Sequence, residues 1–399
     1  MTESDDDRAL GIYVHFPWCL RKCGYCDFLS VAADRSAIPH HAYADSVVAE
    51  LDRRISLVRP ASLRSVYIGG GTPSLWSPAA VGRVLEVLAG RFATTDDLEI
   101  TVECNPSSFD GATARGLRAA GVNRVSLGVQ SLDDARLVFL ERLHDARSAV
   151  AALEAARTAG FARVSADLIY GVAGQSPSDA ALEAARLAAL GPTHVSAYTL
   201  TIEPATPFAA RARQGTLPLL HDDLVAESFL AVDTALAEAG FEHYEISNFA
   251  RAGHVSRHNL GYWHGRDYLG LGCGAWGTVT LRDGRRTRYR NSPEPATYLR
   301  AAAESNDPFR ATVGGLVSET EVIDPETAMR ERIMLGLRLA GGIDVEHAAR
   351  SLGVEPWPPA REQAAARLVA RDRLVRDGPI LRIPPHAWLV ADGTIAELL

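Results

Sequence analysis

The sequence alternates short runs rich in Val, Ile and Leu with longer stretches of helical periodicity over its first two-thirds. Runs typical of strands buried on both faces occur at six places, namely residues 11–17, 65–71, 98–105, 124–131, 163–171 and 194–202. Stretches with helical spacing follow them at residues 41–55, 79–92, 111–120, 146–159, 178–189 and 222–239. Six strand–helix units in succession predict a parallel sheet with right-handed crossovers. An open (β/α)6 barrel and a doubly wound sheet both fit, and periodicity alone does not separate them.

The last third of the chain has a different pattern. Residues 244–277 are rich in Gly, His, Tyr and Trp with weak periodicity, so we expect a functional loop region there. Residues 282–290 contain an Asp283-Gly284 turn, which favours a basic hairpin. Helical patterns followed by a second Asp-Gly turn resemble a winged helix, with helices expected at residues 325–339, 344–352, 359–373 and near Ile395.

The length of 399 residues predicts one large and one smaller domain. We expect a disordered segment over residues 1–10, a large α/β domain over 11–290 and a helical domain over 291–399. The net charge of −8 argues against a large nucleic-acid footprint, and we expect no nucleic-acid partner. The acidic N-terminus is not a secretory signal, and no apolar run approaches the roughly 20 residues of a membrane helix. We therefore expect a cytoplasmic protein.

The cysteines are unevenly placed. Three of the five, Cys19, Cys23 and Cys26, lie within eight residues directly after the first predicted strand. An odd, crowded set argues against a disulfide framework and for a metal site in a reducing compartment. A structural zinc site usually has four ligands on two knuckles, and a second knuckle is missing here, although His15 or Asp27 could complete one. Three thiolates on a [4Fe–4S] cluster would leave one iron open. The remaining interpretation is that the three cysteines are unrelated to one another and are simply buried.

The spacing C-x3-C-x2-C, with Tyr25 before the last cysteine, resembles the radical S-adenosylmethionine (SAM) superfamily. The resemblance implies that Cys19, Cys23 and Cys26 hold a [4Fe–4S] cluster whose open iron chelates SAM. It also implies an open, partial (β/α)6 barrel with a smaller, winged-helix-like C-terminal domain.

Polar residues lie at or near the ends of the later predicted strands, where parallel α/β barrels place ligand contacts. The motifs around them resemble those of the oxygen-independent coproporphyrinogen III oxidase group over nearly all of residues 11–340. For any single one of these residues, a strand-terminal capping role is the competing interpretation. The resemblance implies SAM contacts at Tyr13, Tyr25, Gly70, Gly71, Thr72, Glu103, Gln130, Arg142, Asp167 and Thr201.

Two branches of that group compete. The true oxidases carry a fourth cysteine two residues after the third, where this chain has Phe28, and a longer N-terminal segment. Both departures resemble the HemW heme chaperone branch. So does the H-N-x-x-Y element formed by His258, Asn259 and Tyr262, which the resemblance links to heme binding. Imidazole and phenolate are both axial ligands of heme iron, although the residues alone also fit ordinary loop hydrogen bonding.

The resemblance implies a chaperone that binds heme, a [4Fe–4S] cluster and SAM and delivers heme to apo-hemoproteins, with help from an electron donor. It is compatible with peripheral association with membrane hemoproteins. The rival function is the oxidative decarboxylation of coproporphyrinogen III, and the residues leave open whether any enzymatic activity is kept. A transcriptional or scaffold role of the tail is a third interpretation. Two further cysteines, Cys104 and Cys273, are expected to be packing residues, although Cys273 could also ligate heme.

Overall fold

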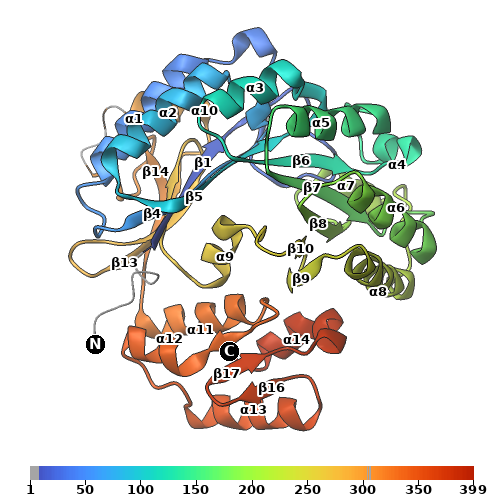
Figure 1. Cartoon of the computed structure of the whole chain (residues 1–399). Coiled ribbons are helices and arrows are strands. Elements are labelled where there is room, and N and C mark those ends of the chain that lie inside the picture. Colours follow the sequence, from blue (N-terminus) through green and yellow to red (C-terminus); the bar gives the residue numbers. More distant parts are fainter. Residues whose placement is uncertain (1–8, 303, 305–306) are drawn as a thin grey trace.

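The computed structural model describes residues 9–302, 304 and 307–399. The chain forms two units with separate hydrophobic cores, one containing residues up to Val317 and the other beginning at Met329 (Figure 1). The expected disorder of residues 1–8 lies outside the described residues. For residues 9 and 10 the expectation was wrong, because Ala9 and Leu10 begin the first strand and are buried.

A twelve-stranded sheet forms the first unit, in the order β14-β13-β12-β11-β1-β4-β5-β6-β7-β8-β10-β9. Its six central strands pair in parallel and correspond to the six predicted ones. They are β1 (Ala9–Phe16), β4 (Ser62–Gly70), β5 (Thr94–Cys104), β6 (Arg124–Gln130), β7 (Arg163–Tyr170) and β8 (His194–Thr199). The predicted strand–helix alternation is therefore confirmed.

Helices cover the outer face of the curved sheet (Figure 1). They are α1 (His40–Arg54), α2 (Pro78–Arg91), α3 (Gly111–Ala119), α4 (Asp134–Phe139), α5 (Ala146–Thr158), α6 (Pro177–Ala189), α7 (Pro207–Arg213) and α8 (Asp222–Glu238). Many begin at a side-chain cap, as α6 does at Ser176, which forms a capping box with Asp179. Because the helices line one face and the two edge strands, β9 and β14, do not pair with each other, the sheet is an open barrel and not a doubly wound sheet.

Short elements connect these units. The chain beyond β1 forms the small pair β2 (Trp18–Cys19) and β3 (Val31–Ala32), and single 3-10 turns occur at η1 (Arg35–Ala37), η2 (Pro73–Leu75) and η3 (Pro106–Ser108).

Residues 244–277, expected to be a loop region, are largely structured. They contain β9 (Glu242–Glu245), β10 (Asn248–Ala250), α9 (Arg257–Trp263), β11 (Tyr268–Leu271) and the start of β12 (Trp276–Thr280). These elements are too short to show periodicity, and β11 is held by parallel pairing with β1. The predicted hairpin is confirmed as β12 with β13 (Arg286–Asn291), turning at Gly284 with φ +87°.

The boundary between the units differs from the expected residue 290. Both α10 (Pro295–Ala301) and β14 (Val317–Ile323) belong to the first unit, since β14 pairs with β13 and Tyr298 lies in the first core. The C-terminal unit holds α11 (Pro325–Gly336), α12 (Val345–Leu352), α13 (Pro359–Ala370), α14 (Ala391–Ala396), η4 (Pro385–Val390) and the sheet of β15 (Ile343–Asp344), β17 (Ile380–Arg382) and β16 (Val375–Asp377).

Candidate functional site

A cavity of about 360 Å³ lies inside the barrel and opens beside the cysteine loop. Its lining includes most of the residues predicted from the sequence. They are Cys19, Tyr25, Cys23, Cys26, Gly70, Gly71, Thr72, Glu103, Gln130, Arg142, Asp167, Thr201 and Asn259. The fold therefore brings together residues that are up to 240 positions apart in the chain.

The three cysteines of the loop border this cavity without forming a site for one ion. Cys19 is buried at the end of β2, and Cys23 and Cys26 are partly exposed. Among the described residues, no group of three or more His, Cys, Asp or Glu side chains could hold a single metal ion. This result is compatible with a [4Fe–4S] cluster, because its cysteines bind different iron atoms and need not converge on a point. Burial raises the pKa of Cys26 to about 11, so binding iron must release a proton.

Arg142 connects the cysteine loop to the barrel. Its Nη1 lies 3.6 Å from Cys23 Sγ and 3.3 Å from the Tyr25 hydroxyl, and its Nη2 donates to the Gly128 carbonyl at 3.1 Å. A guanidinium in this place stabilises negative charge on a thiolate. Arg142 can therefore orient the loop and offset part of the charge of a bound cluster.

The backbone N–H groups of the glycine turn at the end of β4 are already occupied. The N–H of Gly70 donates to Glu103 Oε2 at 3.0 Å, and those of Gly71 and Thr72 donate to the carbonyls of Phe16 and Trp18. Gly70 has φ +108°, and a Cβ there would lie 2.6 Å from the His15 ring. With these N–H groups occupied, Gly70, Gly71 and Thr72 cannot offer backbone donors to an anionic ligand.

Two carboxyl groups face the cavity from the inner surface of the sheet. Glu103 Oε1 accepts from the Tyr67 hydroxyl at 2.8 Å, and Asp167 Oδ1 accepts from Ser126 at 3.3 Å. Burial raises the pKa of Glu103 to about 7 and that of Asp167 to about 6. Buried carboxylates of this kind favour a cationic partner, because it restores the charge compensation that burial removed.

Gln130 holds an unusual backbone conformation at the end of β6. Its φ is +64°, a left-handed value that is uncommon outside glycine, and its side chain lines the cavity. Thr201 lies beyond the end of β8, exposed at the cavity mouth.

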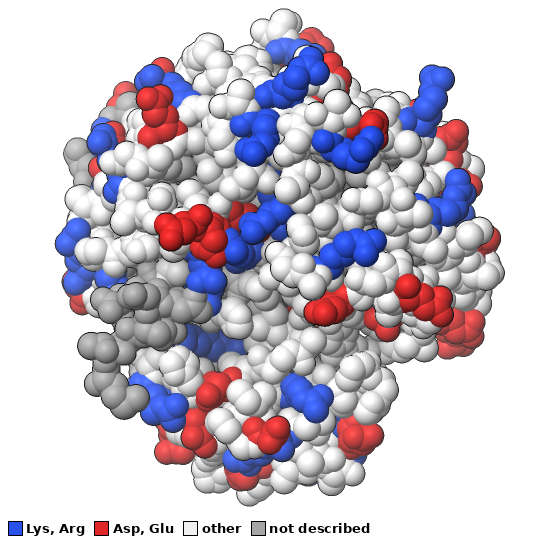
Figure 2. Space-filling model, viewed as in Figure 1, with Lys and Arg blue, Asp and Glu red and all other residues white. Residues whose placement is uncertain are grey.

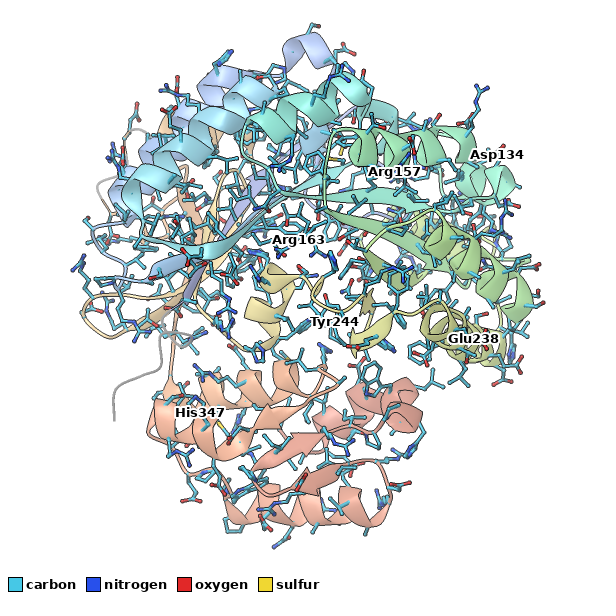
Figure 3. The ribbon with its side chains drawn as sticks, in the orientation of Figure 1. Asp134, Arg157, Arg163, Glu238, Tyr244 and His347 are labelled. Carbon is cyan, nitrogen blue, oxygen red and sulfur yellow. The ribbon has the colours of Figure 1, made fainter. Side chains whose placement is uncertain are left out.

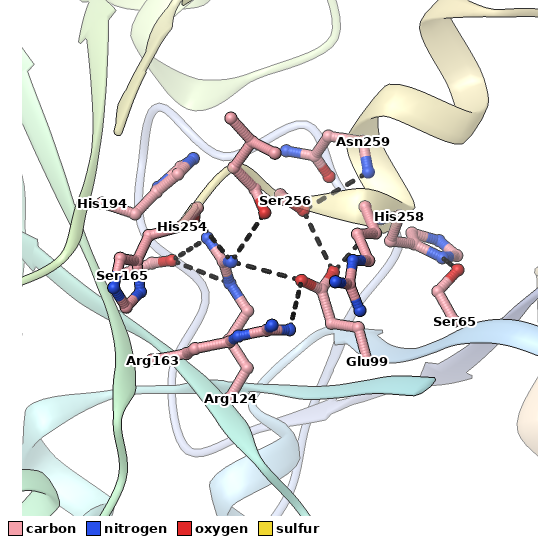
Figure 4. Close-up of polar contacts among 12 residues, drawn as sticks. Ser65, Glu99, Arg124, Arg163, Ser165, His194, His254, Ser256, His258 and Asn259 are labelled. Atoms are coloured by element: carbon pink, nitrogen blue, oxygen red, sulfur yellow. Dashed lines mark hydrogen bonds and ion pairs between the residues drawn. The ribbon is translucent and has the colours of Figure 1, made fainter. Parts of the chain in front are cut away.

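The inner end of the cavity contains polar residues that the sequence reasoning missed. Arg124 Nη1 pairs with Glu99 Oε2 at 3.2 Å, and Arg124 also binds Ser165 Oγ at 2.9 Å (Figure 4). The pattern was visible in the sequence, because polar residues alternate along four neighbouring strands. These residues are Glu99, Thr101 and Glu103, then Arg124 and Ser126, then Ser165 and Asp167, then His194 and Ser196.

The H-N-x-x-Y element forms α9, which closes this inner end (Figures 1 and 4). Of its three predicted residues, only Asn259 lines the cavity. His258 is 3% exposed, and its ring nitrogens lie 2.9 Å from Ser65 Oγ and 2.9 Å from the Tyr262 hydroxyl. Both nitrogens are therefore occupied, and a heme iron could bind His258 only after α9 moved.

Tyr13 is the one predicted SAM contact that the described lining of the cavity does not include. Its hydroxyl lies 2.9 Å from His15 Nδ1, and its ring stacks on Tyr67, which does line the cavity. Tyr13 is thus placed to position Tyr67, and a SAM contact at Tyr13 stays a prediction.

The two remaining cysteines are buried, and Cys104 also lines the barrel cavity. Cys104 and Cys273 are 5% and 0% exposed. The Cys273 thiol lies 3.3 Å from the Ser292 carbonyl. Among the described residues, no helix is long and apolar enough to span a membrane.

Comparison with known proteins agrees with this geometry. The family model described as Radical SAM superfamily matches residues 13–186, and the HemN C-terminal domain matches residues 323–390. A Mycobacterium tuberculosis protein named heme chaperone HemW is 34% identical over 98% of this chain and 95% of its own length. The protein of that name from Escherichia coli is 37% identical over 73% of this chain and 75% of its own length.

The solved structure of Escherichia coli coproporphyrinogen III oxidase (HemN) has the same fold. It superposes with a TM-score of 0.79 at 22% identity, over 98% of this chain and 90% of that one. The family models and the full-length relative together show that this chain belongs to the radical SAM superfamily and, within its HemN-like group, to the HemW family.

Proposed function

We propose that the protein is a heme chaperone of the radical SAM type, which binds heme and delivers it to apo-hemoproteins. The observation that carries the proposal is the 34% identity over 98% of the chain to a protein named heme chaperone HemW. A residue of this chain supports it. Position 28 is a phenylalanine, 62% exposed beside the cluster loop, where the resemblance places a fourth cysteine in the true oxidases.

Cys19, Cys23 and Cys26 would hold a [4Fe–4S] cluster, and the cavity would hold SAM. When bound, the reduced cluster supplies an electron to SAM. The chain's own groups fit this pair, since Arg142 lies against the cysteine loop and the buried carboxyl groups of Glu103 and Asp167 face the same cavity. We propose SAM contacts at the lining residues predicted above, and an external electron donor that reaches the loop through its partly exposed Cys23 and Cys26.

The size of the barrel cavity suits a ligand such as SAM. At about 360 Å³ it lies at the lower end of the 300–1,000 Å³ typical of small-molecule sites. Heme contact at His258, Asn259 and Tyr262 stays a prediction that requires movement of α9.

Two assays test the proposal. Anaerobically reconstituted protein should show iron–sulfur absorbance that Cys23→Ser loses and Cys104→Ala, a cysteine outside the loop, retains. Hemin titration of the wild-type protein should give a saturable Soret shift, and the holo-protein should pass heme to an apo-hemoprotein. Steady conversion of coproporphyrinogen III to protoporphyrinogen IX would contradict the chaperone function and establish the oxidase.

A further inference from the structure

A second and larger cavity lies between the two units of the chain. Its volume is about 840 Å³, and its walls come from the β12–β13 hairpin, the end of α9 and β14 on one side and from α11 and α12 on the other. We call it the interdomain cleft. Figure 1 shows α9 between the curved sheet and the C-terminal unit, and Figure 2 shows basic side chains recessed in the groove that separates the two units.

The interdomain cleft is strongly basic in an acidic protein. Six arginines and three aspartates line it, which leaves an excess of three positive charges, whereas the chain carries −8 overall. Its arginines are Arg59, Arg266, Arg282, Arg285, Arg286 and Arg332. The barrel cavity, by contrast, is lined by four basic and four acidic residues and has no such excess.

The aspartates of the cleft are already engaged. Asp324 caps α11 by accepting from the Thr327 N–H at 2.9 Å, and Asp344 caps α12 by accepting from the His347 N–H at 2.7 Å. Asp267 lies 3.3 Å from Arg286. Helix caps and an ion pair account for these negative charges, and Arg285 on the hairpin turn pairs with Asp283 at 2.8 Å. The lining as a whole still keeps an excess of positive charge, which attracts an anion.

Apolar surface and imidazole rings complete the lining. Val322 on β14 is 59% exposed toward this cleft, and Trp263, Leu281 and Leu352 also line it. Two histidines lie on opposite walls, His264 just after α9 and His347 on α12, and Figure 3 labels His347 on the C-terminal unit. Both side chains are exposed to the cleft.

We propose that the heme carried by this chaperone binds in the interdomain cleft, with its propionates held by the cleft arginines and its iron bound by an imidazole of the lining. The proposal rests on the proposed function. A heme offers a flat apolar ring, two carboxylates and an iron atom, and the cleft offers a matching partner for each. Its two walls belong to separate units joined at Asp324, so a change in their separation would expose the cargo.

The test is hemin titration of the full chain, followed by the Soret band. The double variant Arg282→Glu with Arg285→Glu reverses two exposed charges on the hairpin turn. It should weaken hemin binding by about tenfold or more, since charge-assisted hydrogen bonds are lost. The matched control, Arg157→Glu with Arg186→Glu, makes the same charge change on the exposed faces of α5 and α6 and should bind hemin normally.

Two further measurements separate the roles of the carboxylates and the iron. Hemin dimethyl ester lacks the free carboxylates and should bind the wild-type protein about tenfold more weakly than hemin. This measurement uses only the wild-type protein, so it does not depend on whether a variant folds. His264→Ala with His347→Ala should shift the Soret maximum of the bound heme, as expected when an axial imidazole is lost.

The outcomes distinguish this proposal from the function on which it rests. Failure of the wild-type protein to bind hemin would overturn both. A second outcome is that the cleft variant and the control variant bind hemin with equal affinity, and that the wild-type protein binds the ester as tightly as hemin. This would place heme elsewhere and leave the chaperone function standing. A third outcome is that Arg282 and Arg285 are needed to bind a labelled DNA duplex but not to bind hemin. This would assign the cleft to nucleic acid and also overturn the proposal.

Discussion

His258 gives the sharpest test of how α9 is held in the barrel. The ring is buried with both nitrogens hydrogen-bonded, and burial lowers its pKa from the ordinary 6.5 to about 3. It stays neutral in the folded chain at mildly acidic pH, while the unfolded chain takes up a proton below pH 6.5. Because the folded pKa is lowered, this group costs stability as the pH falls from about 6.5 toward 3.

The magnitude follows from linkage. At about pH 5 the unfolded state gains about 2 kcal/mol from protonating one histidine of ordinary pKa, and the folded state gains almost nothing. Other groups titrate in the same range. The raised pKa of Glu103 acts in the opposite sense, because a carboxyl group with a raised pKa stabilises the fold as the pH falls. The informative quantity is therefore a difference between the wild-type protein and His258→Gln, which cannot titrate.

Urea unfolding at about pH 7.5 and pH 5, followed by circular dichroism, measures that difference, provided that the wild-type protein and the variant have the same m value. The stability advantage of the wild-type protein over His258→Gln should shrink by about 2 kcal/mol at the lower pH. Gln214→Ala, at an exposed residue that cannot titrate, serves as the control, and its difference from the wild-type protein should be the same at both pH values. An advantage that is equal at both pH values would show that His258 is not held neutral in the barrel.

Three more predictions concern the barrel interior. Arg124→Met should cost about 3 kcal/mol in urea unfolding, because buried Glu99 loses its 3.2 Å partner and keeps only Arg163 at 3.8 Å, and adding Glu99→Gln should recover much of the loss. The affinity for SAM, measured by calorimetry on reconstituted protein, should fall about tenfold between about pH 8 and pH 6 as Glu103, with a pKa of about 7, takes up a proton, whereas Glu103→Gln should be flat. Gln130→Gly should raise stability by about 1 kcal/mol by relieving φ +64°, and it should weaken SAM binding if the predicted contact is correct.

The strand–helix units could be predicted from the sequence because each is long enough to show its period. The strands of the parallel sheet are buried on both faces, and each lies between stretches of helical spacing, so β6 and β7 began and ended near the predicted residues. The ligand-facing residues of the cavity could be placed for a related reason. The carboxyl ends of parallel strands share one edge of the barrel, so Glu103, Gln130 and Asp167 had to lie close together.

The rest depends on contacts between segments far apart in the chain. The seven residues of α9 are too few to reveal a helical face, and the direction of His258 is set by Ser65 on β4, which lies 193 positions away. The interdomain cleft was equally hidden, since its arginines come from separate segments and look like ordinary solvated charges in the sequence.

The position of α9 places one continuous set of contacts between the barrel cavity and the interdomain cleft. Glu103 accepts from Tyr67, the Tyr67 ring stacks on His258 at a centroid distance of 5.0 Å, and His258 lies 2.9 Å from Tyr262. The next residues of the chain, Trp263 and His264, line the cleft.

SAM in the barrel and heme in the cleft would thus lie on opposite sides of one helix and never touch. An effect of SAM on heme release would have to displace α9 or the units around it, and His258→Gln should then uncouple the two ligands while each still binds alone. If SAM changes the hemin affinity of the wild-type protein and of His258→Gln by the same factor, the coupling does not run through this helix.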